Sequence, residues 1–263
     1  MSPFWTTALA GLAVALGLMT LVWIGSLVKR DASIIDIFWG LGFVLVAWTY
    51  LWLSGAGTVR AYLVAGLVTL WGLRLSLYIL WRNWGEEEDY RYREMRERNP
   101  KTFPWRSLVT VFWLQGALLW AISLPLLQAE RIPEPAGLTW IDGLGILFFV
   151  VGFVFEAGGD WQMARFKRDP ANEGKVLDHG LWRYTRHPNY FGDAMVWWGL
   201  FMFAAATGAL WTIYSPVIMT ILLMRVSGVT LLEKRLQETK PRYRDYVERT
   251  NAFFPWFPSD PGR

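Results

Sequence analysis

Residues 3–28 read PFWTTALAGLAVALGLMTLVWIGSLV, a run without a single charged side chain. A helix needs about 20 apolar residues to cross roughly 30 Å of hydrocarbon, and this run is longer than that. It is also too long for the apolar part of a signal peptide, and Lys29 and Arg30 follow it rather than precede it. We therefore expect this run to be a membrane-spanning helix.

Similar apolar stretches recur along the chain. Unpaired backbone groups are costly in lipid, so a spanning segment must be a helix or part of a closed barrel. Continuous apolar runs lack the alternation of barrel strands, which leaves the helix. The sequence thus predicts an all-α polytopic membrane protein, a single domain over residues 1–263. Its expected spans, about seven, are 3–28, 34–54, 60–81, 107–128, 138–163, 191–207 and 209–232.

The basic residues test this count. They gather between the first and second spans, the third and fourth, the fifth and sixth, and after the seventh. The other connections carry only Arg60 and Arg131. Because Lys and Arg stay on the cytoplasmic side, this pattern predicts an N-terminus outside and a C-terminus in the cytoplasm. It also predicts cytoplasmic loops over 82–106 and 164–190.

Composition narrows the classes of function. Hydrophobic residues make up 54% of the chain and charged residues only 18%, which favours a membrane protein over a soluble one. There is no Cys, and the two His are His179 and His187, so we expect no disulfide and no metal. The formal charge of +4 is modest, and we attribute it to topology rather than to a nucleic-acid partner.

Ionisable residues inside apolar runs are costly and usually mark a functional site. Here they are Asp36, Arg74, Glu156 and Arg225, with Asp160 near the end of its span. Glu156 and Asp160 share a helix face, where like charges repel unless a cation or a hydrogen-bonding ligand intervenes. Simpler roles stay open for Asp36, as an acid at a helix start, and for Arg74, whose long side chain can reach the interface.

The densest polar stretch is LWRYTRHPNYFGD, residues 181–193. Arg side chains pair with phosphates and stack on flat rings, while Asn189 and Asp193 can bind ribose hydroxyls or an amide. An interfacial belt of Arg and aromatic residues would also explain Trp182 and Tyr190, but it explains the Asn and the Asp poorly. We therefore treat this stretch as a candidate nucleotide site.

Residues 186–193, RHPNYFGD, are similar to the C-terminal signature shared by steroid 5α-reductases, Δ14-sterol reductases and isoprenylcysteine carboxyl methyltransferases. The elements DIFWG (36–40), EDYRY (88–92) and PRYRDY (241–246) with NAFFPW (251–256) resemble the bacterial branch of the 5α-reductase-like proteins. The resemblance covers most of residues 33–258.

This resemblance implies a seven-helix bundle that binds NADPH on its cytoplasmic side and admits an apolar substrate from the bilayer. It implies catalytic roles near the substrate ketone for Asp36 and Tyr78, although the animal enzymes have Glu as the acid and Tyr78 is placed by its span rather than by a motif. Trp39, Arg74 and Glu156 would support the substrate or these residues. The implied cofactor contacts are Asp160, Lys167, Arg183, Tyr184, Arg186, His187, Asn189, Tyr190, Asp193 and Arg225.

The implied reaction is the reduction of a C=C bond conjugated to a carbonyl in a steroid-like substrate, with hydride from NADPH. Tyr78 and a protonated Asp36 would donate hydrogen bonds to the carbonyl oxygen as charge builds there. No GxGxxG motif follows a strand, so the nucleotide site is not of Rossmann type.

Two alternatives remain open. One is a membrane methyltransferase that uses S-adenosylmethionine, to which Glu233, Tyr243 and Tyr246 in the basic tail would contribute. The other is a non-catalytic lipid-binding or transport protein, since ions inside spans also mark transport paths. In each case we expect membrane lipids as neighbours, in a bacterial inner membrane or, in a eukaryote, the endoplasmic reticulum.

Overall fold

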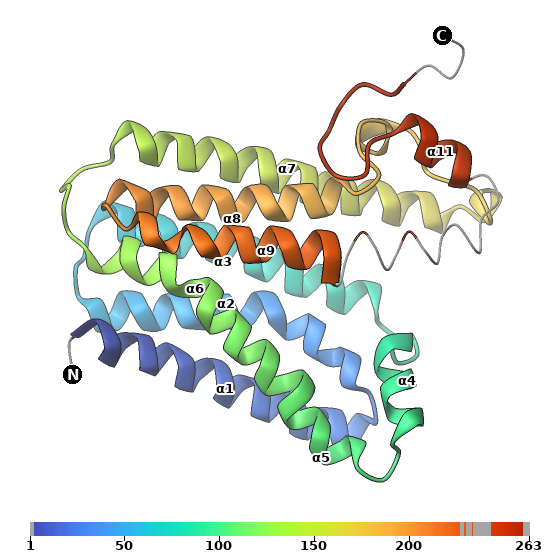
Figure 1. Cartoon of the computed structure of the whole chain (residues 1–263), viewed down its shortest axis with the longest axis horizontal. Helices are drawn as coiled ribbons and strands as arrows, with labels where there is room; N and C mark the ends of the chain where they lie inside the picture. Colours follow the sequence, from blue (N-terminus) through green and yellow to red (C-terminus); the bar gives the residue numbers. More distant parts are fainter. Residues whose placement is uncertain (1–2, 227–228, 230–232, 234–242, 260–263) are drawn as a thin grey trace. The chain divides into compact units, whose positions relative to one another are not determined.

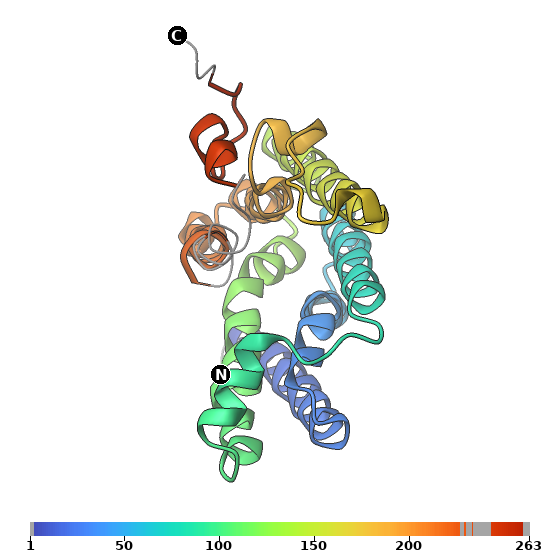
Figure 2. The ribbon, with the colours of Figure 1, turned by 90° about the vertical axis from the view of Figure 1, so that its right-hand side faces the viewer.

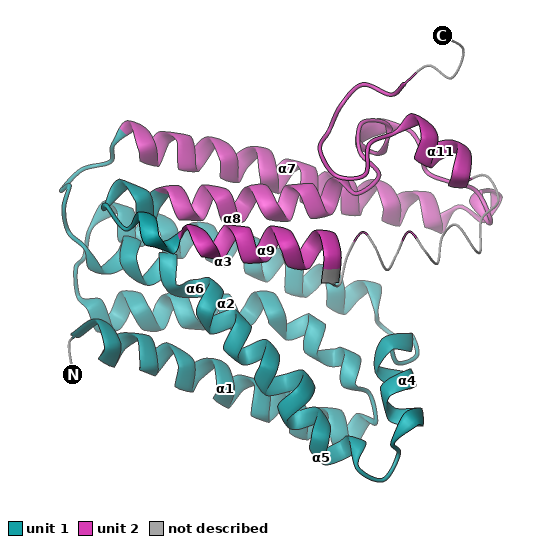
Figure 3. Cartoon of the chain, in the orientation of Figure 1, with its two compact units in different colours: residues 1–139, 203–212 teal, residues 140–202, 213–263 magenta. Residues whose placement is uncertain are grey.

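A computed structural model of the chain consists of helices joined by loops (Figure 1). It describes residues 3–226, 229, 233 and 243–259, and this part of the chain contains no strand. The all-α class is therefore confirmed. The chain divides into two compact units, of which unit 1 is Met1–Thr139 with Phe203–Thr212 and unit 2 is Trp140–Met202 with Ile213–Arg263 (Figure 3).

Unit 1 is built around one central helix, α2, which contacts three others (Figures 1 and 2). The long helices of this unit are α1 (Pro3–Lys29), α2 (Ile35–Ser54), α3 (Val59–Arg82) and α6 (Leu114–Arg131). Between α3 and α6 the chain forms α4 (Tyr90–Arg98), α5 (Phe103–Ser107) and the π-helical turn η2 (Leu108–Trp113). A short 3-10 turn, η1 (Ala32–Ile34), leads into α2, and another, η5 (Leu210–Ile213), begins in the returning segment.

Local sequence signals explain where these helices end. Gly55 adopts a left-handed conformation (φ 62°) and closes α2, as glycine does at many helix C-termini. Thr58 then caps α3, because its hydroxyl accepts a hydrogen bond from the N–H of Ala61. Gly208 (φ 82°) lies in the tight turn after α8 (Pro188–Ala206), between the sixth and seventh predicted spans.

Unit 2 contains a long helix, α7, packed against α8, with the shorter helices after them. Its elements are α7 (Trp140–Arg168), η3 (Pro170–Asn172), η4 (Gly180–Arg183), most of α8, α9 (Tyr214–Ile221), η6 (Leu222–Val226) and α11 (Tyr243–Arg249). α7 continues to Arg168 instead of ending near residue 163, because its last turn carries Arg165, Lys167 and Arg168. Cations are favourable at the negative end of a helix dipole.

Five helical segments in the described part of the chain are long and apolar enough to cross a membrane: Pro3–Lys29, Ala32–Ser54, Val59–Arg82, Phe103–Arg131 and Trp140–Arg168. They coincide with the first five predicted spans, so the chain is a polytopic membrane protein. The sixth predicted span, 191–207, corresponds to α8, and the seventh, 209–232, begins with the shorter apolar helix Leu210–Arg225. Its predicted end at 227–232 falls largely outside the described residues.

The crossing of α7 and α8 brings the two backbones into contact through glycines. Gly145, Gly152 and Gly159 recur at heptad spacing on α7, and Gly192 and Gly199 do so on α8. A Cβ added at Gly152 would lie 2.6 Å from the N of Val196, and one at Gly199 would lie 2.7 Å from the O of Gly145. No side chain fits at these glycine positions, so the register of the two helices is fixed.

Unit 1 also contains a close contact between two helix backbones at glycines. A Cβ at Gly72 of α3 would lie 2.6 Å from the carbonyl oxygen of Gly40 on α2. The hydroxyl of Ser76 also accepts a hydrogen bond from the N–H of Leu41 (2.9 Å). This close crossing fixes the first turns of α2, where Asp36 lies.

A methyl group placed in the α7–α8 crossing should destabilise the protein. We expect Gly152→Ala to lower the free energy of unfolding by about 1–3 kcal/mol, because the added carbon must displace backbone atoms. Gly143→Ala is the matched control, since it lies on the same helix with nothing within 4 Å of its added Cβ. Thermal melting in detergent measures both, and equal melting temperatures would contradict the close crossing.

Candidate functional site

Asn189 and Asp160 form the centre of the polar site in unit 2. The side-chain amide of Asn189 donates to Oδ1 of Asp160 (3.1 Å), and Asp160 is buried. The pair meets because Gly159 lets the start of α8 approach closely: a Cβ there would lie 3.1 Å from the N of Asn189. Pro188 opens α8, where its missing N–H costs nothing.

Other predicted residues lie on the same two helices. Glu156 and Asp160 are both buried on α7, as their spacing predicts. Gly192 packs against the backbone of Glu156, so the acid lies directly under the α8 crossing. Tyr190 and Asp193 occupy the first turns of α8, and the ring of Tyr190 stacks on that of His187, with centroids 5.5 Å apart. The structure thus gathers six of the predicted cofactor or supporting residues around the α7–α8 crossing.

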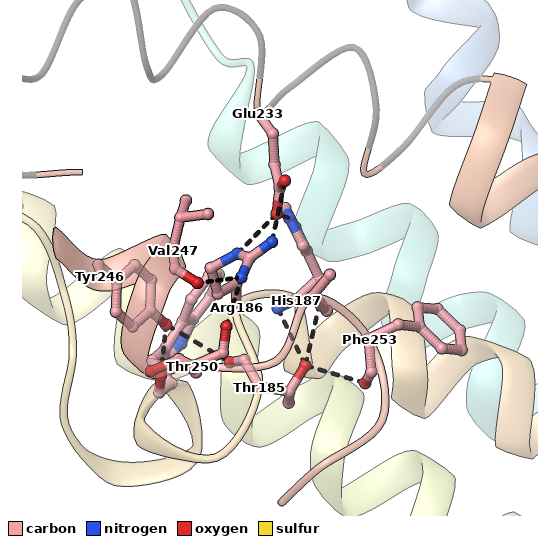
Figure 4. Close-up of polar contacts among 10 residues, drawn as sticks. Thr185, Arg186, His187, Glu233, Tyr246, Val247, Thr250 and Phe253 are labelled. Atoms are coloured by element: carbon pink, nitrogen blue, oxygen red, sulfur yellow. Dashed lines mark hydrogen bonds and ion pairs between the residues drawn. The ribbon is translucent and has the colours of Figure 1, made fainter. Parts of the chain in front are cut away.

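Arg186 is held inside the protein by ion pairing and by backbone carbonyls (Figure 4). Its Nε and Nη2 donate to the two carboxylate oxygens of Glu233, at 2.7 and 3.0 Å. Its Nη1 donates to the carbonyls of Val247 (3.0 Å) and Thr250. A bidentate pair of this kind is strong and directional. A phosphate contact from Arg186 would therefore have to compete with Glu233.

The backbone around Arg186 is tied to the C-terminal part of the chain as well. The N–H of Arg186 donates to the carbonyl of Asn251 (2.9 Å), and the hydroxyl of Thr185 donates to that of Phe253 (2.9 Å). From α11, the Tyr246 hydroxyl donates to the carbonyl of Trp182. We call this set of contacts, between residues 182–187 on one side and Glu233 with residues 246–256 on the other, the C-terminal latch.

His187 is almost fully buried and joins the latch through Glu233. Its Nε2 lies 3.1 Å from Oε1 of Glu233. Burial lowers the pKa of His187, although the hydrogen bond to Glu233 opposes this, so the imidazole is neutral. Burial disfavours the Glu233 carboxylate, but the hydrogen bonds from His187 and Arg186 outweigh it and lower its pKa to about 2. Nε2 therefore carries the proton, and the buried Nδ1 is an acceptor without a partner among the described residues.

The remaining predicted cofactor residues lie further from this centre. Lys167 is on the last turn of α7. Arg225 is exposed in η6, and its side chain makes no hydrogen bond or ion pair with any described residue. Arg183 and Tyr184 are exposed at the end of η4. Arg183 lines a hollow of about 440 Å³, and the ring of Tyr184 meets that of Phe257 edge to face.

Asp36 has its own polar cluster, in unit 1. The Arg91 guanidinium donates to Oδ2 of Asp36 and the Tyr92 hydroxyl donates to Oδ1, each at 3.1 Å. The side-chain amide of Gln115 donates in turn to the hydroxyl oxygen of Tyr92 (3.3 Å). Asp36 thus accepts from two side chains of α4, far from it in the sequence.

The acidic residues that precede α4 hold these donors in place. Asp89 caps α4 through the N–H of Arg91 (2.9 Å) and also accepts from the Arg91 Nε (2.9 Å). Glu88 accepts from Arg96 (2.8 Å) and from the backbone N–H of Ala32, just before α2 (2.7 Å). The EDYRY element is therefore a clamp between the starts of α2 and α4.

The charges in this clamp shift two pKa values outside the spans. Burial raises the pKa of Tyr92, and the nearby Asp36 raises it further, so the phenol keeps its proton at neutral pH. Burial opposes the charge on Arg91, but its hydrogen bond with Asp89 and the proximity of Asp36 raise its pKa above the usual value. Arg91 is thus a permanent cation and Tyr92 a permanent hydrogen-bond donor.

The other predicted residues of unit 1 lie on α2 and α3. Arg74 and Arg82 both stack on the ring of Tyr78, with their guanidinium carbons 5.5 and 5.8 Å from its centroid. Such contacts are favourable cation–π interactions. Trp39 meets Phe43 edge to face. The partners recorded for Asp36 are Arg91 and Tyr92, which the sequence alone did not single out as site residues.

Removing the latch arginine should weaken the fold. We expect Arg186→Ala to cost about 3–5 kcal/mol, because it leaves a largely buried carboxylate without its partner. The control is Arg93→Ala, which breaks the exposed pair with Glu87, a kind of pair that contributes about 0–1 kcal/mol. Denaturant unfolding in detergent compares the two variants. An equal loss of unfolding free energy in both would show that the latch ion pair contributes no more than an exposed surface pair.

The same latch should respond to acid. Since the folded-state pKa of Glu233 lies near 2, its stabilisation is complete above the usual Glu pKa of 4.5 and disappears as pH falls from there toward 2. Glu233→Gln should abolish that part of the pH dependence. Melting temperatures of the wild type and the variant, measured between pH 2 and pH 4.5, test this prediction. If the two melting temperatures fall in parallel with pH, Glu233 is not the group responsible.

Comparisons with known proteins agree with a membrane protein of this kind without naming a reaction. An uncharacterized protein of Schizosaccharomyces pombe is 26% identical to this chain, over 93% of the chain and 78% of its own length. No solved structure matches. The model of the family described as "Protein of unknown function (DUF1295)" matches residues 22–250, which include both polar clusters up to Thr250. Because this match covers most of the sequence, the chain belongs to the DUF1295 family.

Proposed function

We propose that this protein is an NADPH-dependent membrane reductase. Its substrate would be a lipophilic, steroid-like molecule with a C=C bond conjugated to a carbonyl. The observation that carries the proposal is the hydrogen bond between Asn189, at the start of α8, and Asp160 on α7. Asn189 belongs to the RHPNYFGD stretch, and the close glycine crossing of the two helices brings the pair together. That stretch resembles the signature shared by steroid 5α-reductases, Δ14-sterol reductases and isoprenylcysteine carboxyl methyltransferases, and the elements DIFWG and EDYRY add the resemblance to the 5α-reductase-like branch.

The finer topology is part of this proposal. Seven spans, with the N-terminus outside and the C-terminus in the cytoplasm, would put Lys167, α4 and α11 on the cytoplasmic side, where a soluble nucleotide is available. The basic last turns of α3 and α7 support this orientation under the positive-inside rule. A bacterial inner membrane is the location that fits the bacterial branch of the resemblance.

The residues of unit 2 fit a dinucleotide by their chemistry. Asn189 and Asp160 offer an amide and a carboxylate for hydroxyl or amide groups, and Lys167 and Arg225 offer cations for phosphates. The buried Nδ1 of His187 is an acceptor that a polar atom of a bound group would satisfy. NADPH would supply the hydride, and the protein would supply binding, orientation and exclusion of water.

The residues of unit 1 fit a carbonyl group that gains charge. When hydride adds to the β-carbon, the electron pair of the C=C bond moves toward the carbonyl oxygen, and a hydrogen-bond donor there lowers the barrier. Tyr92 is protonated at neutral pH and held by Gln115 and Asp36. We therefore propose Tyr92, in place of Tyr78, as the phenol that acts with Asp36. The Tyr92 hydroxyl, which donates to Asp36 in this structure, would turn its proton to the carbonyl oxygen when substrate binds. A proton added at the α-carbon completes the reduction.

The reaction can be tested directly with the purified protein in detergent. We expect it to consume NADPH, followed by its near-ultraviolet absorbance, in the presence of 3-oxo-Δ4 steroids and to form a 5α-reduced product. NADPH should also raise the melting temperature, since a ligand that binds only the folded state stabilises it. A melting shift with S-adenosylhomocysteine and none with NADPH would favour the methyltransferase instead.

The cofactor site has its own variant. Asn189→Ala should raise the KM for NADPH about tenfold, the effect of losing one good hydrogen bond. Asn251→Ala is the matched control, because its exposed side chain makes no hydrogen bond with any described residue. An unchanged KM in Asn189→Ala would remove this residue from the cofactor site.

The donor assignment makes a separate prediction. Tyr92→Phe should reduce kcat by about 100-fold or more, the usual contribution of a positioned proton donor, with little change in the KM for NADPH. Tyr62→Phe, at an exposed position on α3, should leave kcat unchanged. If Tyr78→Phe reduces kcat and Tyr92→Phe does not, the donor is Tyr78.

A further inference from the structure

The hollow beside the latch is a polar site that the proposed reduction does not use. It measures about 440 Å³ and lies within unit 2. Three separate segments form its walls: the loop around η4, the end of α11 and the C-terminal stretch after it. The residues that line it include Asp178, His179, Arg183, Arg249, Pro258 and Ser259.

The hollow carries surplus positive charge. The side chain of Arg183 makes no hydrogen bond or ion pair with any described residue, although it lines the hollow. Arg249 is 3.4 Å from Asp178, and both of these side chains are more than two-fifths exposed, so the pair only partly neutralises the guanidinium. His179 adds an imidazole whose recorded contact is the ring of Phe166. An anion would satisfy these groups.

The walls are fixed before any ligand arrives. The Tyr246 hydroxyl donates to the carbonyl of Trp182 beneath the hollow. The N–H of Ser259 donates to the carbonyl of Arg249 (2.8 Å), and that of Trp256 donates to the carbonyl of Tyr184 (2.9 Å). The arginines thus project from a backbone that is already ordered, which limits the entropy lost on binding.

The same C-terminal stretch exposes a group of large aromatic rings. Phe254, Trp256 and Phe257 are 65%, 68% and 74% exposed, and they directly precede Pro258 and Ser259 of the hollow. In membrane proteins, exposed aromatic rings of this kind lie at the level of the lipid headgroups. A soluble anion would explain the arginines but not the exposure of these three rings to the surroundings.

We propose that this hollow binds the phosphate group of an anionic phospholipid. Arg183 and Arg249 would pair with the phosphate oxygens, His179 would donate a further hydrogen bond, and the rings would rest among the headgroups. This assigns Arg183 to a lipid rather than to the nucleotide. The proposal is independent of the reduction, since it involves none of the residues around the α7–α8 crossing.

The test uses the full chain in neutral detergent with phosphatidic acid, whose headgroup is a phosphate monoester, and phosphatidylcholine as the neutral-headgroup control. Phosphatidic acid should raise the melting temperature more than phosphatidylcholine does. In Arg183→Gln/Arg249→Gln its apparent affinity should fall at least about tenfold, because two charge-assisted contacts are lost. Arg244→Gln is the matched control, an exposed arginine on α11 that does not line the hollow.

Two results would overturn the proposal. One is an equal response to phosphatidic acid in the wild type and the double variant, provided that both melt at similar temperatures without lipid. The other is a melting shift with inorganic phosphate or 2′,5′-ADP that the double variant loses, without any preference for phosphatidic acid. That second result would identify a soluble phosphate ligand instead.

Discussion

Direct contact between helix backbones is the constraint on which the polar sites depend. At the α7–α8 crossing the carbonyl of Gly145 and the N–H of Val196 occupy the space where side chains would otherwise lie. The same crossing brings Asn189 to Asp160, because Gly159, which precedes Asp160, has no Cβ to keep the start of α8 away. The Gly40–Gly72 contact does the same for the start of α2, which carries Asp36. Close packing of helix backbones therefore positions Asp36 and the Asn189–Asp160 pair.

Ion pairs then fix how the segments outside the long helices dock on them. Each cluster sets an arginine against a carboxylate: Arg91 with Asp36 in unit 1 and Arg186 with Glu233 in unit 2. A buried or partly buried ion pair adds little net stability when the desolvation of both partners is counted, but removing one partner is costly. Such pairs therefore specify how loops dock on helices. The EDYRY clamp and the C-terminal latch are two examples of this role.

The sequence predicts the helices well because their apolar runs are long and their caps are recognisable, as at Gly55 and Thr58. It also predicts Asp36 and Asp160 as special, since a charge in an apolar run is conspicuous by itself. The partners of such residues cannot be derived from the sequence, because they lie far away along the chain. Arg91 is 55 positions from Asp36, and, in the other cluster, Glu233 is 47 positions from Arg186. Arg60 shows the same limit, because it looks like a loop cation but is buried and donates to the carbonyls of Pro135 and Gly137. Tertiary contacts decide whether an arginine meets a ligand or the chain itself.

The C-terminal latch has a consequence for the order of events during synthesis. The carbonyls that receive Arg186 and Thr185 belong to residues 247–253, which lie 61 to 68 positions further along the chain. Helices such as α1 and α2 can pair as soon as both have entered the membrane, but residues 182–187 cannot reach their final arrangement until residues 247–253 have been synthesised. Until then, Arg186 lacks the backbone carbonyls that hold it. The arrangement around Arg186 is therefore a later step of folding than the pairing of α1 with α2.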